Sequence, residues 1–257
     1  MKAFRPAGYL FIAVALIAFG IQHFIYLDFI TRVFAPFPTW IPAHAIFAVF
    51  AGVFLCLTGA AILQKTYACI LCLALAGTIL LMFIIVQLPN LIANLSNPMI
   101  WTNAGKALVL AGVSLIAAGS LAKNEPKFCG KLSVPMISLG KLFLAGFFML
   151  AAVMHFLYAD FVATLIPTWI PAHLFWTYFA AIALIAGALG MFISKTKFYA
   201  AALLALMIFL WLILLHAPRA IADLHNANET TAFFEALAMC GACLLIASKK
   251  HFHDFNK

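Results

Sequence analysis

The segment that decides the fold occurs twice: HFIYLDFITRVFAPFPTWIPAH spans residues 23–44, and HFLYADFVATLIPTWIPAH spans residues 155–173. The first residues of the two copies match at an offset of 132, from position 23 to position 155. A three-residue deletion then changes the offset to 129, and PTWIPAH recurs letter for letter in both copies. Seven identical residues in a row indicate that the chain is an internal duplication.

The 129-residue offset continues beyond these segments, where it pairs Pro89 with Pro218 and Lys106 with Glu235. Each half therefore carries the same layout along nearly its whole length. The domain organisation predicted from this layout is a first unit over residues 1–123, a cytoplasmic linker over 124–136 and a second unit over 137–257.

The composition places both units in a lipid bilayer. Of the 257 residues, 67% are hydrophobic and 9% are charged, and the mean hydropathy is +1.14. A soluble domain is about half apolar and a quarter charged, which excludes a water-soluble globule. The net charge of +8 is explained by basic flanks that orient membrane helices, so no nucleic-acid partner is expected.

Long uncharged stretches predict an all-α polytopic protein with eight transmembrane helices. Two stretches, which follow Lys106 and Glu235, are shorter than the roughly 20 residues that a crossing needs. The fourth and eighth helices are therefore expected to carry these charged residues inside their first turns. The predicted helices span residues 8–27, 42–63, 66–88, 102–121, 137–158, 171–193, 197–217 and 231–248.

Basic residues cluster in alternate loops, which predicts the orientation. By the positive-inside rule, both termini lie in the cytoplasm and both PTWIPAH segments lie outside the inner (plasma) membrane. Four helices per half bring the two halves into the membrane in the same direction. We therefore expect two four-helix bundles related as a parallel repeat.

At these residues the chain resembles the DoxX-like family of four-helix membrane proteins, as two such units in tandem. The shared features are His23 near the outer end of the first helix, the Asp28-Phe29 pair, the PTWIP entry into the second helix, and the charged Lys106 opening the fourth. The resemblance implies a redox-associated membrane subunit, because family members are linked by name to thiosulfate:quinone oxidation and to membrane oxidoreductase complexes. It also implies a soluble oxidoreductase partner.

Acidic and aromatic residues at the outer surface have a structural explanation. Asp28 and Asp160 are expected to cap short interfacial helices, with the proline of each WIP entering the first turn of the next helix. Trp40 and Trp169 fall where interfacial tryptophans belong. A role in substrate binding is the alternative for all four residues.

The repeated histidines are the candidate catalytic residues, because histidine exchanges protons near neutral pH. A structural role, bonding a carbonyl or an aspartate across the bundle, is the alternative. An outward-facing pocket in each unit can hold a quinone head group or a small acid. Metal or haem ligation by the four repeated histidines is a minor option, because the spacing of local ligands is absent. The expected pocket residues are His23, His44 and Gln87 in the first unit, and His155, His173 and His216 in the second.

Two charged pairs are expected to close the outer ends of these pockets. An unpaired charge at membrane depth is costly, which favours pairing. We expect Lys106 to pair with Asp28, and Glu235 to pair with Arg219, each within its own unit.

Two CxxC patterns, at residues 69–72 and 240–243, offer a competing redox interpretation. Neither recurs at the 129-residue offset, so packing by small side chains is the interpretation we favour.

Three functions remain open at this point: a membrane subunit of a redox or quinone-linked process, a carrier or binding protein for a small lipophilic molecule or lipid, and a non-catalytic assembly or scaffold subunit.

Overall fold

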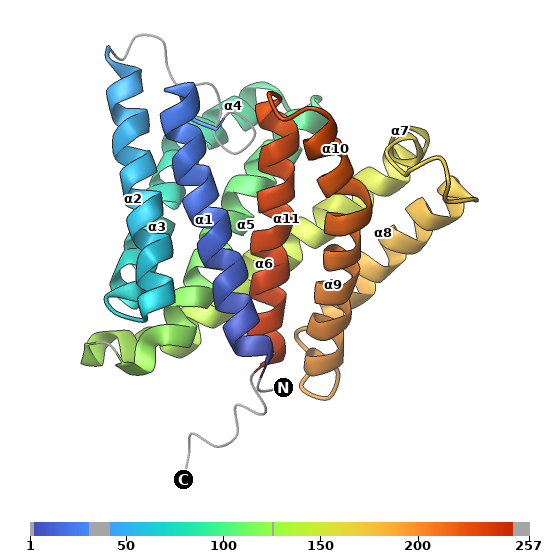
Figure 1. Ribbon diagram of the computed structural model, residues 1–257. Coiled ribbons are helices and arrows are strands. Elements are labelled where there is room, and N and C mark those ends of the chain that lie inside the picture. The colour runs from blue at the N-terminus through green and yellow to red at the C-terminus, as the bar shows by residue number, and fades with distance from the viewer. Residues whose placement is uncertain (1–2, 31–41, 125, 249–257) are drawn as a thin grey trace.

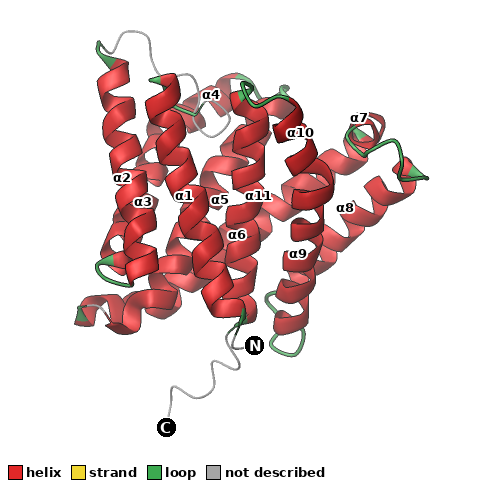
Figure 2. Cartoon of the chain, in the orientation of Figure 1, coloured by secondary structure: helices red, strands yellow, loops and turns green. Residues whose placement is uncertain are grey.

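The computed structural model describes residues 3–30, 42–124 and 126–248, and within these ranges every regular element is a helix (Figure 2). Eight of the helical spans are long and apolar enough to cross a membrane, which confirms the predicted all-α polytopic architecture. The elements are α1 (Phe4–Tyr26), α2 (His44–Gln64), α3 (Ala68–Met82), the π-helical η1 (Phe83–Gln87), α4 (Leu88–Ala93), α5 (Pro98–Leu121), the 3-10 turn η2 (Ala122–Asn124), α6 (Lys127–Leu157), α7 (Ala159–Thr164), α8 (His173–Gly190), α9 (Lys197–Trp211), the π-helical η3 (Leu212–His216), α10 (Ala217–Ala222) and α11 (Ala227–Ala247).

Each membrane-spanning segment runs in the direction opposite to that of the segment before it (Figure 1). α1 begins and α11 ends at the same end of the bundle, which we call the terminal end (Figure 1). The short helices α4, α7 and α10 lie at the opposite end, which we call the distal end (Figure 1). Which end faces the cytoplasm remains a prediction from the basic residues.

The duplication extends to unusual features of the backbone. The π-helical segments η1 and η3 occupy equivalent positions at the 129-residue offset. Ala43 and Ala172, also equivalent, both adopt left-handed conformations with φ of 58° and 59° immediately before α2 and α8. Such a conformation is uncommon for a residue with a side chain, so its recurrence shows that the two halves share local geometry as well as sequence.

The two halves nevertheless do not form separate bundles. α1 packs against α2 of its own half and against α11 of the other half, whereas its contact with α5 is slight. In the same way α6 packs against α8 and against α5, and α5 also contacts α11. The expectation of two self-contained four-helix bundles is therefore wrong at the level of packing, since each first helix lies against the fourth helix of the other half.

Close glycine contacts explain this exchange. A Cβ atom on Gly8 of α1 would lie 2.8 Å from the carbonyl oxygen of Gly241 on α11, and one on Gly140 of α6 would lie 2.5 Å from that of Gly112 on α5. Gly140 is the equivalent of Gly8, and Gly241 is the equivalent of Gly112, so the same contact is made twice. In a membrane, where burial of apolar side chains gives little preference between lipid and protein, small residues that let two backbones approach determine which helices associate.

The linker predicted over 124–136 is largely helical, because α6 begins at Lys127 and continues through Pro135. α5 and α11 also begin earlier than expected. The side chains of Asn97 and Asn226 accept hydrogen bonds from the backbone N–H groups two residues on, at 3.0 Å in both cases, and so cap the two helices.

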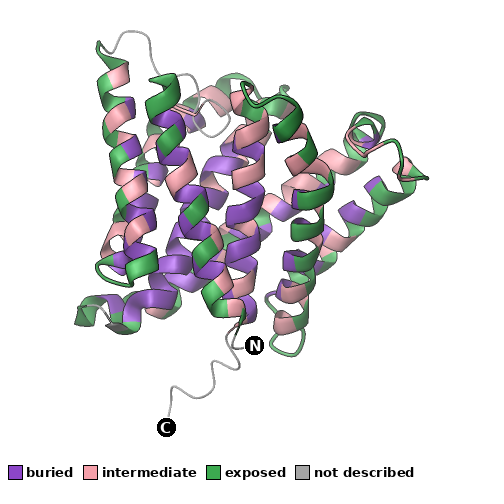
Figure 3. Ribbon diagram, viewed as in Figure 1, coloured by how far each residue is buried: buried purple, intermediate pink, exposed green. Residues whose placement is uncertain are grey.

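Burial is greatest along α5 and α11, which run through the centre of the molecule (Figure 3). In their apolar stretches, the spans Ala68–Ala93 and Lys197–Ala222 are the least buried of the eight. Residues on α5 and α11 that face each other are therefore shielded both from lipid and from water.

Candidate functional site

A buried ion pair joins the two central helices. Lys106 is the ninth residue of α5 and Glu235 is the ninth residue of α11, so each lies in the third turn and about 12 Å along its helix from the distal start. The Nζ atom of Lys106 lies 3.2 Å from Oε2 of Glu235, and the two residues are 7% and 4% exposed. The expectation that both residues lie in first turns is wrong, because the asparagine caps start both helices four residues, about one turn, earlier than predicted.

Both predicted partners of these charges are also wrong. Asp28 is exposed beyond the end of α1, and its Oδ1 accepts a hydrogen bond from the backbone N–H of Phe29 at 2.7 Å. Arg219 on α10 pairs with Glu229 in the first turn of α11, with Nη2 2.6 Å from Oε1. The prediction assumed pairing within each half, whereas the contact between α5 and α11 makes a pair between the halves.

A polar network lies one turn distal to Glu235. Gln22 on α1 donates from Nε2 to the hydroxyl of Thr230 at 2.8 Å, and its Oε1 accepts from the hydroxyl of Thr231 at 3.2 Å. Thr231 precedes Glu235 by four residues, so the two side chains share a face of α11. Gln22 thereby extends the polar surface around the ion pair from α11 onto α1.

His23, next to Gln22, has no exposed surface. Its Nδ1 lies 2.7 Å from the carbonyl oxygen of Phe19; because a carbonyl only accepts, Nδ1 carries the proton and Nε2 of the neutral ring has a free lone pair. Within the described part of the chain, His23 Nε2 and Glu235 Oε1 are buried without a hydrogen-bond partner. We refer to Gln22, His23, Lys106, Thr231 and Glu235 as the distal polar cluster, because all five are buried polar residues in the distal part of α1, α5 and α11.

His155 repeats part of this arrangement. Its Nδ1 bonds the carbonyl oxygen of Ala151 at 2.7 Å, which is the same hydrogen bond to the residue four positions earlier. The surroundings differ, however, because the His155 ring is only half-buried and stacks on Trp211 with ring centroids 6.1 Å apart. The two equivalent histidines thus share a tautomer but not an environment.

The other predicted site residues are spread over the distal part of the molecule. Gln87 is buried at the end of η1, which contacts α5, and His216 is half-buried at the end of η3, which contacts α11. His44 is exposed at the start of α2, and His173 is half-buried at the start of α8. The two pockets predicted from these residues and the repeated histidines stay a prediction.

The interfacial residues agree with the sequence in part. The short helix predicted after the second histidine is α7, but Asp160 is its second residue, and no side chain caps the helix. Pro42 and Pro171 precede α2 and α8 instead of entering their first turns. Trp169 is 69% exposed, as expected for an interfacial residue, whereas Trp40 and most of the first predicted short helix lie outside the described residues.

The described cysteines form no disulfide with one another, and all of them except Cys56 are buried. Both CxxC patterns are buried, and the thiol of Cys240 donates to the carbonyl oxygen of Ala205 at 3.3 Å, which links α11 to α9. Among the residues that the structure describes, no group of three or more His, Cys, Asp or Glu side chains could hold a metal ion. Packing therefore accounts for the cysteines.

Sequence reasoning missed the hydrogen bonds of Gln22 with Thr230 and Thr231, one turn from Glu235. The only signal of Gln22 was a polar side chain within an apolar stretch next to a candidate histidine. It also missed Glu229, although an acidic residue in the first turn of a helix is a recognisable partner for a nearby arginine.

The fold and the site define an all-helical, multi-pass membrane protein whose two repeated halves meet at a buried ion pair. A family model described as a domain of unknown function (DUF8561) matches residues 144–232, about a third of the chain, from α6 into α11. No curated protein and no solved structure matches the chain.

Proposed function

We propose that the protein binds or carries a small amphiphilic molecule whose head group is held at the distal polar cluster, between the two halves. The observation that carries this proposal is the buried Lys106–Glu235 ion pair, which joins equivalent positions of the two halves. A ligand site between repeats is the arrangement found in many carriers.

The physical argument starts from the cost of the ion pair. Charged side chains in a membrane interior are expensive, and a buried pair contributes little net stability compared with apolar residues of the same volume. Glycine contacts join α1 to α11 and α5 to α6, so those two associations do not depend on the ion pair. Binding of a polar ligand by these charged groups explains why they are present in the membrane interior despite the free energy that their burial costs.

The chemistry of the cluster restricts the head group. His23 Nε2 and Glu235 Oε1 are both hydrogen-bond acceptors without a donor among the described residues. A head group that supplies hydrogen-bond donors, such as hydroxyl or ammonium groups, satisfies them, whereas a head group that only accepts does not. The proposal therefore favours a hydroxylated or amine-bearing amphiphile.

The test is to identify what co-purifies with the full chain. Protein extracted in a mild detergent is analysed by native mass spectrometry, and its organic extract by liquid chromatography with mass spectrometry. We expect one amphiphile per chain in the wild type, lost in Glu235→Gln and retained in the matched variant Asp28→Asn, whose carboxylate is exposed. Equal retention in both variants, or no bound molecule in the wild type, would contradict the proposal and favour a scaffold role.

A quinone-linked redox subunit is the second candidate, supported by the same two acceptors. A quinol carries two hydroxyl groups, which match His23 Nε2 and Glu235 Oε1 as hydrogen-bond and proton acceptors. The electrons would pass to a soluble oxidoreductase partner. This candidate predicts that a short-chain quinol quenches the intrinsic tryptophan fluorescence at lower concentration than the corresponding quinone does. Equal affinities for the quinol and the quinone, or a higher affinity for the quinone, would contradict the redox candidate and leave the carrier function as the remaining proposal.

A further inference from the structure

The first turns of α6, from Lys127 to Pro135, are longer than a membrane crossing requires. α6 has 31 residues and is about 46 Å long, whereas the hydrocarbon core of a bilayer is about 30 Å thick. The part from Met136 to Leu157 is about 33 Å long and is enough for one crossing. Figure 1 shows the first turns lying across the terminal end of the bundle, where we call them the interfacial segment.

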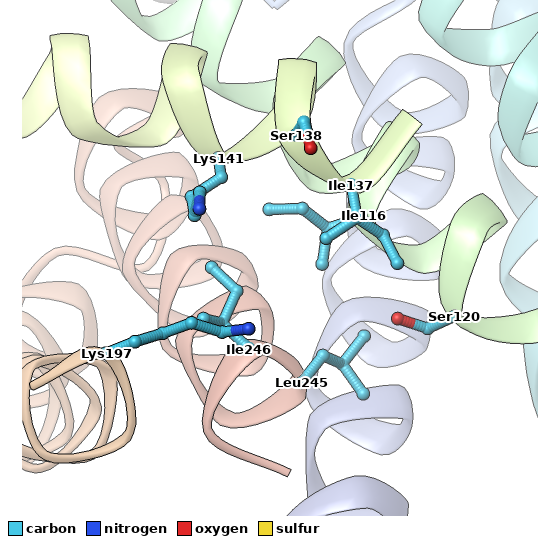
Figure 4. Close-up of a pocket in the computed structure, with 8 residues that line it drawn as sticks. All are labelled: Ile116, Ser120, Ile137, Ser138, Lys141, Lys197, Leu245 and Ile246. Carbon is cyan, nitrogen blue, oxygen red and sulfur yellow. The ribbon is translucent and has the colours of Figure 1, made fainter. Parts of the chain in front are cut away.

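Pro135 marks the boundary between the interfacial segment and the spanning part of α6. The next two residues, Met136 and Ile137, are buried, and Ile137 lines a small recess together with Ile116 of α5 (Figure 4). By the 132-residue offset, Met136 corresponds to Phe4, the first residue of α1. The interfacial segment therefore precedes the part of α6 that repeats α1.

One face of the interfacial segment is fixed to α5. Cys129 is fully buried, and the hydroxyl of Ser133 donates to the carbonyl oxygen of Gly119 at 2.6 Å. A Cβ atom on Gly119 would lie 2.7 Å from the carbonyl oxygen of Ser133, so the two backbones are in close contact. Because Cys129 and Ser133 are four residues apart, they lie on the same face and fix the rotation of the helix.

The other faces of the segment are exposed and differ in character. Lys127 and Lys131 are exposed, lie four residues apart and form a basic face. Phe128 and Leu132 form an apolar face beside it, with 46% and 41% of their surfaces exposed. A basic face next to an apolar one is typical of a helix that lies in the plane of a bilayer surface.

The charge of this region favours an anionic partner. Lys127 and Lys131 make no ion pair with a described residue. Glu125 lies outside the described residues, but the sequence 123–131 contains three lysines against this single glutamate. The region therefore keeps a net positive charge whatever Glu125 contacts.

We propose that the interfacial segment docks on the surface of a bilayer that contains anionic phospholipids. Lys127 and Lys131 contact the phosphate head groups, while Phe128 and Leu132 enter the outer part of the acyl-chain region. A lipid surface fits better than a protein partner, because the segment continues directly into a membrane-spanning helix that brings it to the bilayer surface. This surface uses none of the residues of the distal polar cluster, so the proposal does not rest on the proposed function.

The test measures backbone amide hydrogen exchange of the full-length protein in lipid nanodiscs. One set of discs contains phosphatidylcholine alone, and in the other phosphatidylglycerol replaces part of it. Two lysines at an anionic surface together favour docking by a factor of about 30, so exchange across residues 127–135 should slow by about that factor in the anionic discs. High salt should remove the difference, because it screens exposed charges.

Two double variants separate this segment from the general basic charge of the terminal end. Lys127→Gln/Lys131→Gln should abolish the slowing in anionic discs. Lys65→Gln/Lys195→Gln is the matched control, because it removes the same charge from two exposed lysines in other loops of that end, and it should retain the slowing.

The apolar face has its own variant, Phe128→Ser/Leu132→Ser, which keeps both lysines and should also reduce the slowing. Equal exchange of the wild-type segment in the two kinds of disc would overturn the proposal and leave this surface to an acidic protein partner. Loss of the slowing in Lys65→Gln/Lys195→Gln to the same extent as in Lys127→Gln/Lys131→Gln would also overturn it, because the effect would then come from overall charge.

Discussion

Lys106 and Glu235 occupy equivalent positions of the duplication but carry opposite charges, and the structure explains the difference. The two side chains face each other across the contact between α5 and α11, 3.2 Å apart. Two identical charged residues there would place like charges in contact within a shielded interior. Opposite charges are the solution that keeps both positions ionised.

Removing one partner of this pair should be costly, because it leaves an uncompensated buried charge. We expect Lys106→Met or Glu235→Gln to lower the free energy of unfolding by about 3–5 kcal/mol. The charge-swapped double variant Lys106→Glu/Glu235→Lys should recover most of the loss, as measured by chemical denaturation in detergent micelles. Additive effects in the double variant would show that the two side chains do not interact.

The two equivalent histidines should respond differently to substitution, because only His23 is fully buried within the distal polar cluster. His23→Gln should reduce retention of the co-purifying amphiphile at least tenfold, whereas His155→Gln should leave it within a factor of two. The measurement is the ligand-to-protein ratio after purification. A larger loss for His155 would contradict the placement of the site.

At the scale of residues, the sequence predicted that Lys106 and Glu235 lie at membrane depth and need partners. It did not predict the partners, because pairing within each half was assumed. An internal repeat shows which positions are equivalent, but it does not show whether equivalent helices face each other. Only the packing of α5 on α11 supplies that information.

At the scale of helices, the paired glycines should determine which helices associate. A leucine at Gly140 cannot be accommodated beside the backbone of Gly112, so Gly140→Leu should destabilise the protein by about 2 kcal/mol. Gly146→Leu on the same helix is the matched control, because no atom lies within 4 Å of the position that its Cβ would take. The thermal midpoint in detergent distinguishes the two variants, and equal midpoints would contradict the role of the glycine contact.

The number of helices could be predicted from hydropathy, since each crossing needs a long apolar stretch. Their ends were less predictable. The extension of α6 back to Lys127 was missed because Lys131 and Pro135 interrupt its first turns. The caps at Asn97 and Asn226 were missed because the nearest charged residues were taken as the helix boundaries. The π-helical segments leave no signal in composition, since a change in hydrogen-bond register does not alter hydropathy.

At the scale of the whole molecule, the basic residues predict that the terminal end faces the cytoplasm. In a background without native cysteines, Pro167→Cys should react with a membrane-impermeant maleimide added outside intact cells. Lys195→Cys, at the terminal end, should react only after the cells are opened. The reverse pattern would invert the orientation and place the distal polar cluster nearer the cytoplasm.

The exchange of helix contacts between the halves makes the molecule one folding unit. α1 depends on α11 for its main contact outside its own half, and α6 depends on α5. A ligand site between the halves requires these contacts, because the ion pair exists only when both halves are assembled.

The most direct test is to express residues 1–124 and 125–257 as two separate chains, each carrying a different affinity tag. We predict that neither chain is stable alone, that the co-expressed chains purify together at a one-to-one ratio, and that Gly140→Leu weakens their association. Two halves that are each monodisperse and helical when expressed alone would contradict the interlocked arrangement and, with it, a ligand site shared between them.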